Sequence, residues 1–300
     1  MVDLPAPGQS WRREYPFAVH SLSVDGGRMS YVDEGQGPVV LCVHGNPTWS
    51  FYWRTLIREL SPTHRVVAPD HIGCGLSDKP QDWPYRFEAH IANLQRLVEH
   101  LDLRDITLVV HDWGGAIGSG FAVRNADRIA KLVVTNTAAW PSVRIPTRIA
   151  LCRIPGFGAL AVRGLNGFAG AATFMATEKG LSADARAGLL APYSSWADRI
   201  ATLRFVEDIP MHADHPSRRV MQGVADGLIT LADKPMHLVW GMKDWCFTPK
   251  FLEEWIARFP NATVTRLPDV GHYVMEDAPQ SVIAAVCGLG ASGADPAGGQ

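Results

Sequence analysis

The chain alternates short, continuously apolar runs with segments whose apolar residues recur at helical spacing. The apolar runs, rich in β-branched residues, lie at 38–43, 65–70, 106–110, 130–136, 236–240 and 262–267. Such runs are typical of strands buried on both faces of a sheet. The helical patterns lie at 50–60, 87–101, 116–123, 250–258 and 279–289. Strands and helices in this order predict a parallel sheet with right-handed crossovers.

The amino-terminal pattern is different. Residues 17–24 and 28–33 alternate, and Asp25-Gly26-Gly27 separates them. This is turn chemistry for an antiparallel hairpin. We therefore expect an α/β fold with eight strands, mostly parallel, one antiparallel edge and helices on both faces.

Residues 138–213 contain no strand-like run, and prolines separate their short helical patterns. The segment begins just past the carboxyl end of a predicted strand, the edge at which parallel sheets bind ligands. We expect a helical cap at 138–213, inserted into a core formed by 1–137 and 214–290. Residues 291–300 are rich in Gly and Ala and are expected to be a flexible tail.

The strand at 106–110 leads into His111-Asp112-Trp113-Gly114-Gly115. An Asp here occupies the place of the serine in the Gly-x-Ser-x-Gly turn of serine esterases, which predicts a nucleophile elbow that presents the Asp112 carboxylate. The competing interpretation is that Asp112 only caps the following helix. A base, an orienting acid and an oxyanion site elsewhere in the chain would favour the elbow.

Asp244 and His272 supply the missing partners. Each follows a predicted strand, and the order of Asp112, Asp244 and His272 along the chain is that of α/β-hydrolases. Alone, Asp244 would be read as a surface turn acid. In this order we expect His272 to act as base and Asp244 to hold its tautomer. His111 is expected to point away from the reactive face, because side chains alternate along a strand.

The segment His44-Gly45-Asn46-Pro47 follows the first buried strand and should turn its backbone toward the elbow. The backbone N–H groups of Asn46 and Trp113 can then form an oxyanion hole. Their side chains are neutral N–H donors, which suit a halide or another anion in a dry pocket. The alternative for Trp113 is that it only fills the core.

Composition and motifs exclude several classes of protein. With 28 basic and 30 acidic residues and no basic cluster, the chain has no footprint for nucleic acid. No phosphate-binding glycine motif follows a strand. Five cysteines without a CxxC pair indicate neither disulfides nor zinc, and we expect them to be small buried hydrophobes. We therefore predict no cofactor and no metal.

The first ten residues lack the basic start and apolar run of a signal peptide, and no stretch approaches eighteen apolar residues. We expect a cytoplasmic protein without membrane insertion. The sequence leaves a homo-oligomer open.

The chain resembles haloalkane dehalogenases over nearly its whole length. The residues that carry the likeness are those of 44–49, the elbow at 109–115, Trp240 to Asp244 and Gly271-His272. The resemblance implies an α/β-hydrolase core with a helical cap, no cofactor and small apolar halogenated substrates.

The family mechanism, carried over to these positions, has Asp112 displace a halide that Asn46 and Trp113 bind. His272, supported by Asp244, then activates the water that hydrolyses the alkyl ester. The pairing of Asn46 with an acid after the later strand resembles the third subfamily. A cap tryptophan, Trp140 or Trp196, would instead fit the first.

Residues 136–141 and 191–210 are also similar to β-lactone decarboxylases of bacterial olefin synthesis, which share the elbow, the anion-binding pair and the triad. Dehalogenation is the first expectation for catalytic capability, and the two activities are even as physiological roles. Epoxide hydrolases use two cap tyrosines, but 141–215 contains only Tyr193. Fluoroacetate-type dehalogenases need arginines beside the nucleophile, and residues 113–116 contain none. A non-catalytic binding protein would have a broken triad, whereas all three triad residues are present here. These three alternatives are therefore less favoured.

Overall fold

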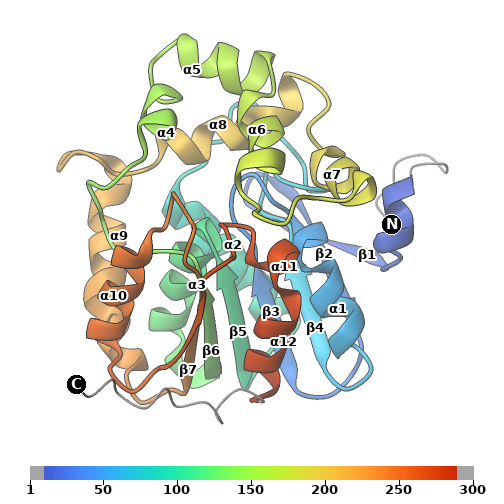
Figure 1. The fold of residues 1–300 in the computed structure, drawn as a ribbon, viewed down its shortest axis with the longest axis vertical. Helices are drawn as coiled ribbons and strands as arrows, with labels where there is room; N and C mark the ends of the chain where they lie inside the picture. The colour runs from blue at the N-terminus through green and yellow to red at the C-terminus, as the bar shows by residue number, and fades with distance from the viewer. Residues whose placement is uncertain (1–9, 289–300) are drawn as a thin grey trace.

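One mixed sheet of eight strands forms the centre of the computed structural model, which describes residues 10–288 (Figure 1). Its strand order is β1-β2-β4-β3-β5-β6-β7-β8. The strands are β1 Val19–Val24, β2 Gly27–Glu34, β3 Val39–Val43, β4 Arg65–Pro69, β5 Ile106–His111, β6 Ile129–Thr135, β7 Met236–Gly241 and β8 Thr263–Leu267. β2 pairs antiparallel with β1 and β4, and all other neighbours are parallel. The predicted eight-stranded sheet with its antiparallel edge is confirmed.

Helices cover both faces of this sheet. Those of the core are α1 Arg54–Leu60, α2 Phe87–His100, α3 Trp113–Arg124, α9 Pro216–Gly227, α10 Pro249–Arg258, α11 Val274–Asp277 and α12 Pro279–Cys287. Alternate residues of β3 show the two layers, since Leu41 and Val43 pack with α2, α3, α9 and α10, whereas Val40 and Cys42 pack with α1, α11 and α12.

Helix α9 was not predicted. Its N-cap is His215, with Pro216 at the first helical position, but the segment contains two glycines and many polar residues. Only four of its side chains are buried: Ser217, Met221, Val224 and Ala225. These four recur at helical spacing, so the sequence did carry a helix signal, which the polar and glycine content of the segment obscured. The predicted helix at 50–60 begins as a 3₁₀ turn, Ser50–Trp53, before α1.

Residues 138–213, which we call the cap, run from the end of β6 to just before α9 and contain helices without any strand. The helices are α4 Thr147–Leu151, α5 Phe157–Ala159, η4 Leu160–Gly164, α6 Gly167–Met175, α7 Ala183–Leu190, η5 Ala197–Arg199 and α8 Ile200–Glu207. Figure 1 shows them at one end of the molecule, beyond the sheet, with α5 farthest out. The predicted tail at 291–300 lies outside the described residues. Within residues 10–288, no helix combines the length and apolar character that crossing a bilayer requires.

Candidate active site

Asp112 lies at the sharp turn between β5 and α3. Its backbone has φ 51° and ψ −129°, a conformation that non-glycine residues rarely adopt. Thr137 Oγ1 donates to the Asp112 carbonyl at 2.5 Å, and the Asp112 amide donates to the Asn136 carbonyl at 3.2 Å. Gly114 lets α3 approach β3, because a Cβ there would be 2.1 Å from the Val43 carbonyl oxygen. Neighbouring strands therefore hold the predicted elbow geometry in place.

The two carboxylate oxygens of Asp112 have different surroundings. Oδ1 accepts the Asn46 backbone N–H at 2.6 Å, and Oδ2 lies 3.8 Å from His272 Nε2. Gly45 permits this approach, since a Cβ there would be 2.2 Å from Oδ1. Burial raises the pKa of Asp112, while His272 and the Asn46 and Trp113 amides act against that rise. Asp112 as a residue is 7% exposed, so it is largely shielded from water.

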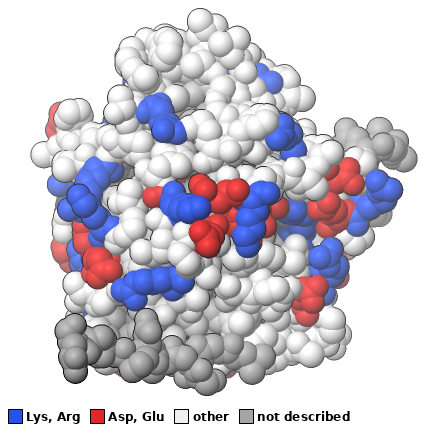
Figure 2. Space-filling model, in the orientation of Figure 1, with Lys and Arg blue, Asp and Glu red and all other residues white. Residues whose placement is uncertain are grey.

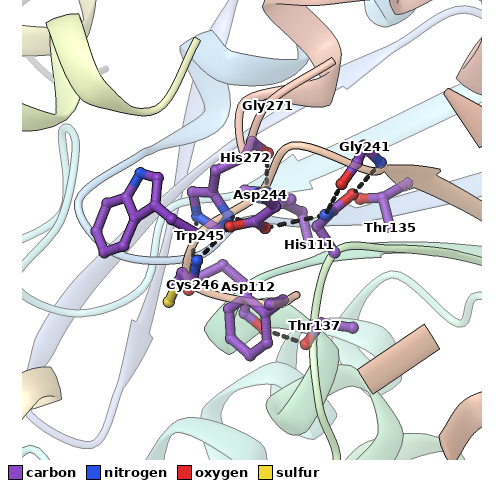
Figure 3. Close-up of polar contacts among 12 residues, drawn as sticks. His111, Asp112, Thr135, Thr137, Gly241, Asp244, Trp245, Cys246, Gly271 and His272 are labelled. Atoms are coloured by element: carbon purple, nitrogen blue, oxygen red, sulfur yellow. Dashed lines mark hydrogen bonds and ion pairs between the residues drawn. The ribbon is translucent and has the colours of Figure 1, made fainter. Parts of the chain in front are cut away.

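His272 and Asp244 form a buried pair beside this carboxylate (Figure 3). His272 Nδ1 lies 2.8 Å from Asp244 Oδ2, and the Cys246 amide donates to Asp244 Oδ1 at 2.6 Å. Burial alone would lower the pKa of His272, but the Asp244 and Asp112 carboxylates outweigh it and raise the pKa. With Nδ1 donating to Asp244, the lone pair of neutral His272 is on Nε2, the nitrogen nearer Asp112.

Asn136, directly after β6, is a residue that the sequence interpretation missed. Its Nδ2 donates to Asp244 Oδ2 at 2.9 Å and to the Gly241 carbonyl at 3.1 Å, while its Oδ1 accepts the Gly241 amide at 2.8 Å. The side chain thus ties the end of β6 to the end of β7 and to the acid. Its position was a signal, because Asn136 directly follows β6 as Asp112 follows β5. The sequence interpretation considered only carboxylates at this position.

His111 lies behind His272. Its Nε2 donates to the His272 carbonyl at 2.9 Å, and the two ring centroids are 4.5 Å apart. Burial, followed by the proximity of His272, lowers the pKa of His111 well below its usual range. His111 is therefore neutral and contacts the backbone of the His272 loop.

The cavity beside Asp112 has two lobes, which meet at this residue. Both lobes are lined by Asn46, Asp112, Ile149, Phe168 and Cys246. The first extends between core and cap, and its walls include Trp113, Trp140, Ile209, Met221 and Phe251. The second extends along α6, and its walls include Ala171, Met175, Trp245, His272 and Tyr273. Counted out to their openings, the lobes hold about 770 Å³ and 760 Å³ of empty space.

Asn46 and Trp113 present neutral donors to this cavity. Asn46 lines both lobes, and its Nδ2 also donates to the Thr202 carbonyl in α8 at 3.1 Å. Trp113 lines the first lobe and packs against Phe205 at a centroid distance of 5.3 Å. Its indole Nε1 bonds to no protein acceptor within residues 10–288. The structure thus brings all five predicted site residues together: Asn46, Asp112, Trp113, Asp244 and His272.

The expectation for the cysteines is only partly right. Cys42 and Cys74 are buried, but Cys152 and Cys246 are partly exposed and line the cavity, and Cys287 is exposed. The correction for Cys246 has a simple origin, since it follows Asp244 on the loop that borders the site. Among the described residues no group of His, Cys, Asp and Glu could hold a metal ion.

The aromatic and aliphatic residues expected as possible cavity walls in the cap are of three kinds. Phe168 lines both lobes of the cavity. Phe174 is exposed, whereas Leu189 and Phe205 are buried in the two hydrophobic cores. Helical spacing alone could not separate a wall of the cavity from packing within the cap.

The chain matches the family model described as alpha/beta hydrolase fold over residues 38–279. It is 42% identical to a cis-3-alkyl-4-alkyloxetan-2-one decarboxylase from Shewanella oneidensis, covering 89% of this chain and 86% of the relative. Haloalkane dehalogenase 2 from Mycobacterium tuberculosis is 34% identical, covering 91% and 94%. The crystal structure of haloalkane dehalogenase DbeA from Bradyrhizobium elkani has a TM-score of 0.82 at 26% identity, covering 92% of this chain and all of that one. The chain belongs to the alpha/beta hydrolase fold family.

Proposed function

We propose that this enzyme is a β-lactone decarboxylase that converts cis-3,4-dialkyl oxetan-2-ones into an olefin and carbon dioxide. The observation that carries the proposal is the pair of apolar lobes that meet at Asp112. A β-lactone with alkyl groups on two adjacent ring carbons has two arms that diverge from one reactive centre, and each lobe can take one. The 42% identity to a relative named for this substrate supports the same choice, and it reorders the sequence expectation, which put dehalogenation first.

The chemistry needs only the Asp112 carboxylate as nucleophile. An Asp112 oxygen bonds to ring carbon C4 as the C4–O bond breaks, which leaves an alkyl ester and a free carboxylate on C3. The C3–carboxylate bond then supplies the electrons of the new double bond, carbon dioxide leaves, and the ester C–O bond returns its electrons to Asp112. Inversion followed by anti elimination gives the cis olefin. No water and no proton are consumed, and the neutral N–H groups of Asn46 and Trp113 suit the transient carboxylate.

Dehalogenation is the second candidate, favoured by His272 Nε2 at 3.8 Å from Asp112 Oδ2. Here the carboxylate displaces a halide toward Trp113 and Asn46. Neutral His272 then takes a proton from a water that attacks the ester carbonyl, the Asn46 and Trp113 amides stabilise the oxyanion, and the alcohol leaves with the proton. The 34% identity to a haloalkane dehalogenase is consistent with this activity.

Epoxide hydrolysis has less support. Tyr193 is buried, its hydroxyl donates to the Thr48 carbonyl at 3.4 Å, and it does not line either lobe. Trp196 is exposed and packs under Arg163, so it is not placed to bind a halide. Trp140 lines the first lobe with a buried indole Nε1 that has no partner in the described chain. It could add a third neutral donor to either proposed reaction.

The test is parallel incubation with a cis-3,4-dialkyl β-lactone, 1-bromobutane and 1,2-dibromoethane. Olefin and its geometry are measured by gas chromatography, and bromide release is measured in solution. We expect cis olefin from the lactone. Bromide release without olefin would reverse the order of the two candidates.

His272→Phe separates the two reactions within one protein. With a bromoalkane, loss of the base should trap the alkyl ester, visible as added mass on the peptide that contains Asp112. With the lactone, olefin formation should persist, because carbon dioxide loss itself breaks the ester. If both reactions stop equally, the proposed water-free route is wrong.

A further inference from the structure

Exposed large apolar side chains are concentrated on the cap. Among residues 10–288 they are Val143, Leu151, Ile154, Phe157, Leu160, Leu165, Phe174, Met175, Trp196 and Ile229. All but Ile229 lie in the cap, and eight of them lie within 143–175, a segment that we call the cap apex. Exposed apolar residues scattered singly need no explanation, but a group of this size marks an interaction surface.

The cap apex is also positively charged. Residues 143–175 contain four arginines and no acidic residue, although the whole chain has a formal charge of −2. Arg144 pairs with Glu254, whereas Arg148, Arg153 and Arg163 form no ion pair with any described residue. Figure 2 shows separate blue groups over the outer part of this face, with red there only at the left margin, and a band of both colours across the middle.

The same surface borders the cavity. Met175 and Arg148 are exposed and also line the second lobe, and Arg144 lines the first. An apolar molecule that reaches Asp112 through either opening therefore passes beside the cap apex. The argument holds for any apolar substrate, so it does not depend on which reaction Asp112 performs.

We propose that the cap apex docks on an anionic lipid bilayer and takes its apolar substrate from there. Phe157 lies on α5, the labelled helix farthest out in Figure 1, and Leu160 and Leu165 lie on and directly after η4, which continues from α5. A protruding tip with apolar side chains can enter the headgroup region, while arginines that form no ion pair can bind anionic headgroups. In this docking no segment crosses the bilayer, and the α/β core stays in water.

Two substitutions form a matched pair for the test. Leu165 is 76% exposed in the cap apex, and Ile229 is 73% exposed outside the cap. The full chain and the variants Leu165→Asp and Ile229→Asp are mixed with vesicles of phosphatidylcholine containing 30 mol% phosphatidylglycerol, or of phosphatidylcholine alone, and separated by flotation. Neither variant touches a site residue, and turnover of a detergent-dispersed substrate verifies that both are folded and active.

We expect the unsubstituted chain to float with the anionic vesicles and much less with the neutral ones. Leu165→Asp should reduce partitioning about tenfold, because it removes an apolar contact and adds a negative charge, and Ile229→Asp should leave it unchanged. Binding should also weaken as salt increases, since it depends on charge. No binding to anionic vesicles, or equal loss in both variants, would overturn the proposal. Self-association in sedimentation velocity that only Leu165→Asp abolishes would show the surface to be a protein interface and overturn it as well.

Discussion

The sheet edge and the cap both contact Asp112, but they are built differently. At the sheet edge, hydrogen bonds of 2.8 and 2.9 Å hold Asp244 against His272 and Asn136. The cap contributes mainly apolar walls, and its polar link to Asn46 is one hydrogen bond from the carboxamide to the Thr202 carbonyl. The difference suggests that the edge sets the reaction and the cap sets which molecule reaches it. Changes at the edge should therefore lower turnover itself, and changes in the cap should alter substrate choice.

Asp112→Asn should have the largest effect. The amide oxygen can still accept the Asn46 N–H, so the fold should persist, but the amide is not a nucleophile. We expect roughly a 10⁴-fold loss of kcat or more for lactone and bromoalkane alike. Turnover and thermal unfolding are measured together, with the cap variant Phe168→Leu as the comparison that should stay within about tenfold. Activity above a tenth of the original would remove Asp112 from its role.

Acid should destabilise the core rather than the cap. Burial lowers the pKa of His71 to about 4 and those of His44, His90 and His111 well below 6.5, so these four stay neutral when folded and gain protons on unfolding. Burial also raises the pKa of Asp70 to about 6, which offsets about one of those protons. Stability should therefore fall as the pH drops from about 7 to 5, because the unfolded chain then binds more protons than the folded chain. All five groups lie outside 138–213.

Urea unfolding at a series of pH values measures this slope. Limited proteolysis at pH 5 shows which part opens first. A flat stability profile from pH 7 to pH 5, or early cleavage confined to the cap, would contradict the assignment of these buried groups.

The sequence predicted the sheet edge well because its signals are local. Asp112, Asp244 and His272 each follow a strand, and parallel strands end at one edge, so position along the chain gives position in space. The role of Asn136 was not predicted, because an asparagine that bridges two strand ends differs from an ordinary loop asparagine only in its hydrogen-bond partners. Those partners, Gly241 and Asp244, are more than a hundred residues away.

The cap resisted prediction for a physical reason. Its helices are short, and each is apolar on sides that face the cavity, the core or the outside. Phe168 lines the cavity whereas Phe174 is exposed six residues later on the same helix, α6. Burial of such side chains depends on how several short helices pack together, and no single pattern encodes that packing.

Asn136→Ala tests whether the edge acts as one unit. Without the Asn136 amide, Asp244 should lose its fixed orientation, and its support of His272 should weaken. We expect kcat for bromoalkanes to fall about thirtyfold at nearly constant KM. Because Asp244 is the main influence that raises the pKa of His272 against burial, the rising limb of the pH profile should move to lower pH. Olefin formation should change less. An unaltered pH profile would mean that Asn136 is only structural.

The smallest expected effects come from filling one lobe at a time. Ile209→Trp narrows the first lobe and Ala171→Phe the second. The substrates are two cis β-lactones of equal size, one with the long arm on C3 and the other with the long arm on C4. If each arm occupies one lobe, the two variants should disfavour opposite isomers, each by about tenfold in kcat/KM with little change in kcat for the tolerated isomer. Edge variants cannot produce such a reversal, because they act on the reaction common to both isomers. If both cap variants lowered turnover of both isomers equally, the cap would not select the substrate. The proposed division, with the reaction set at the sheet edge and substrate choice in the cap, would then be wrong.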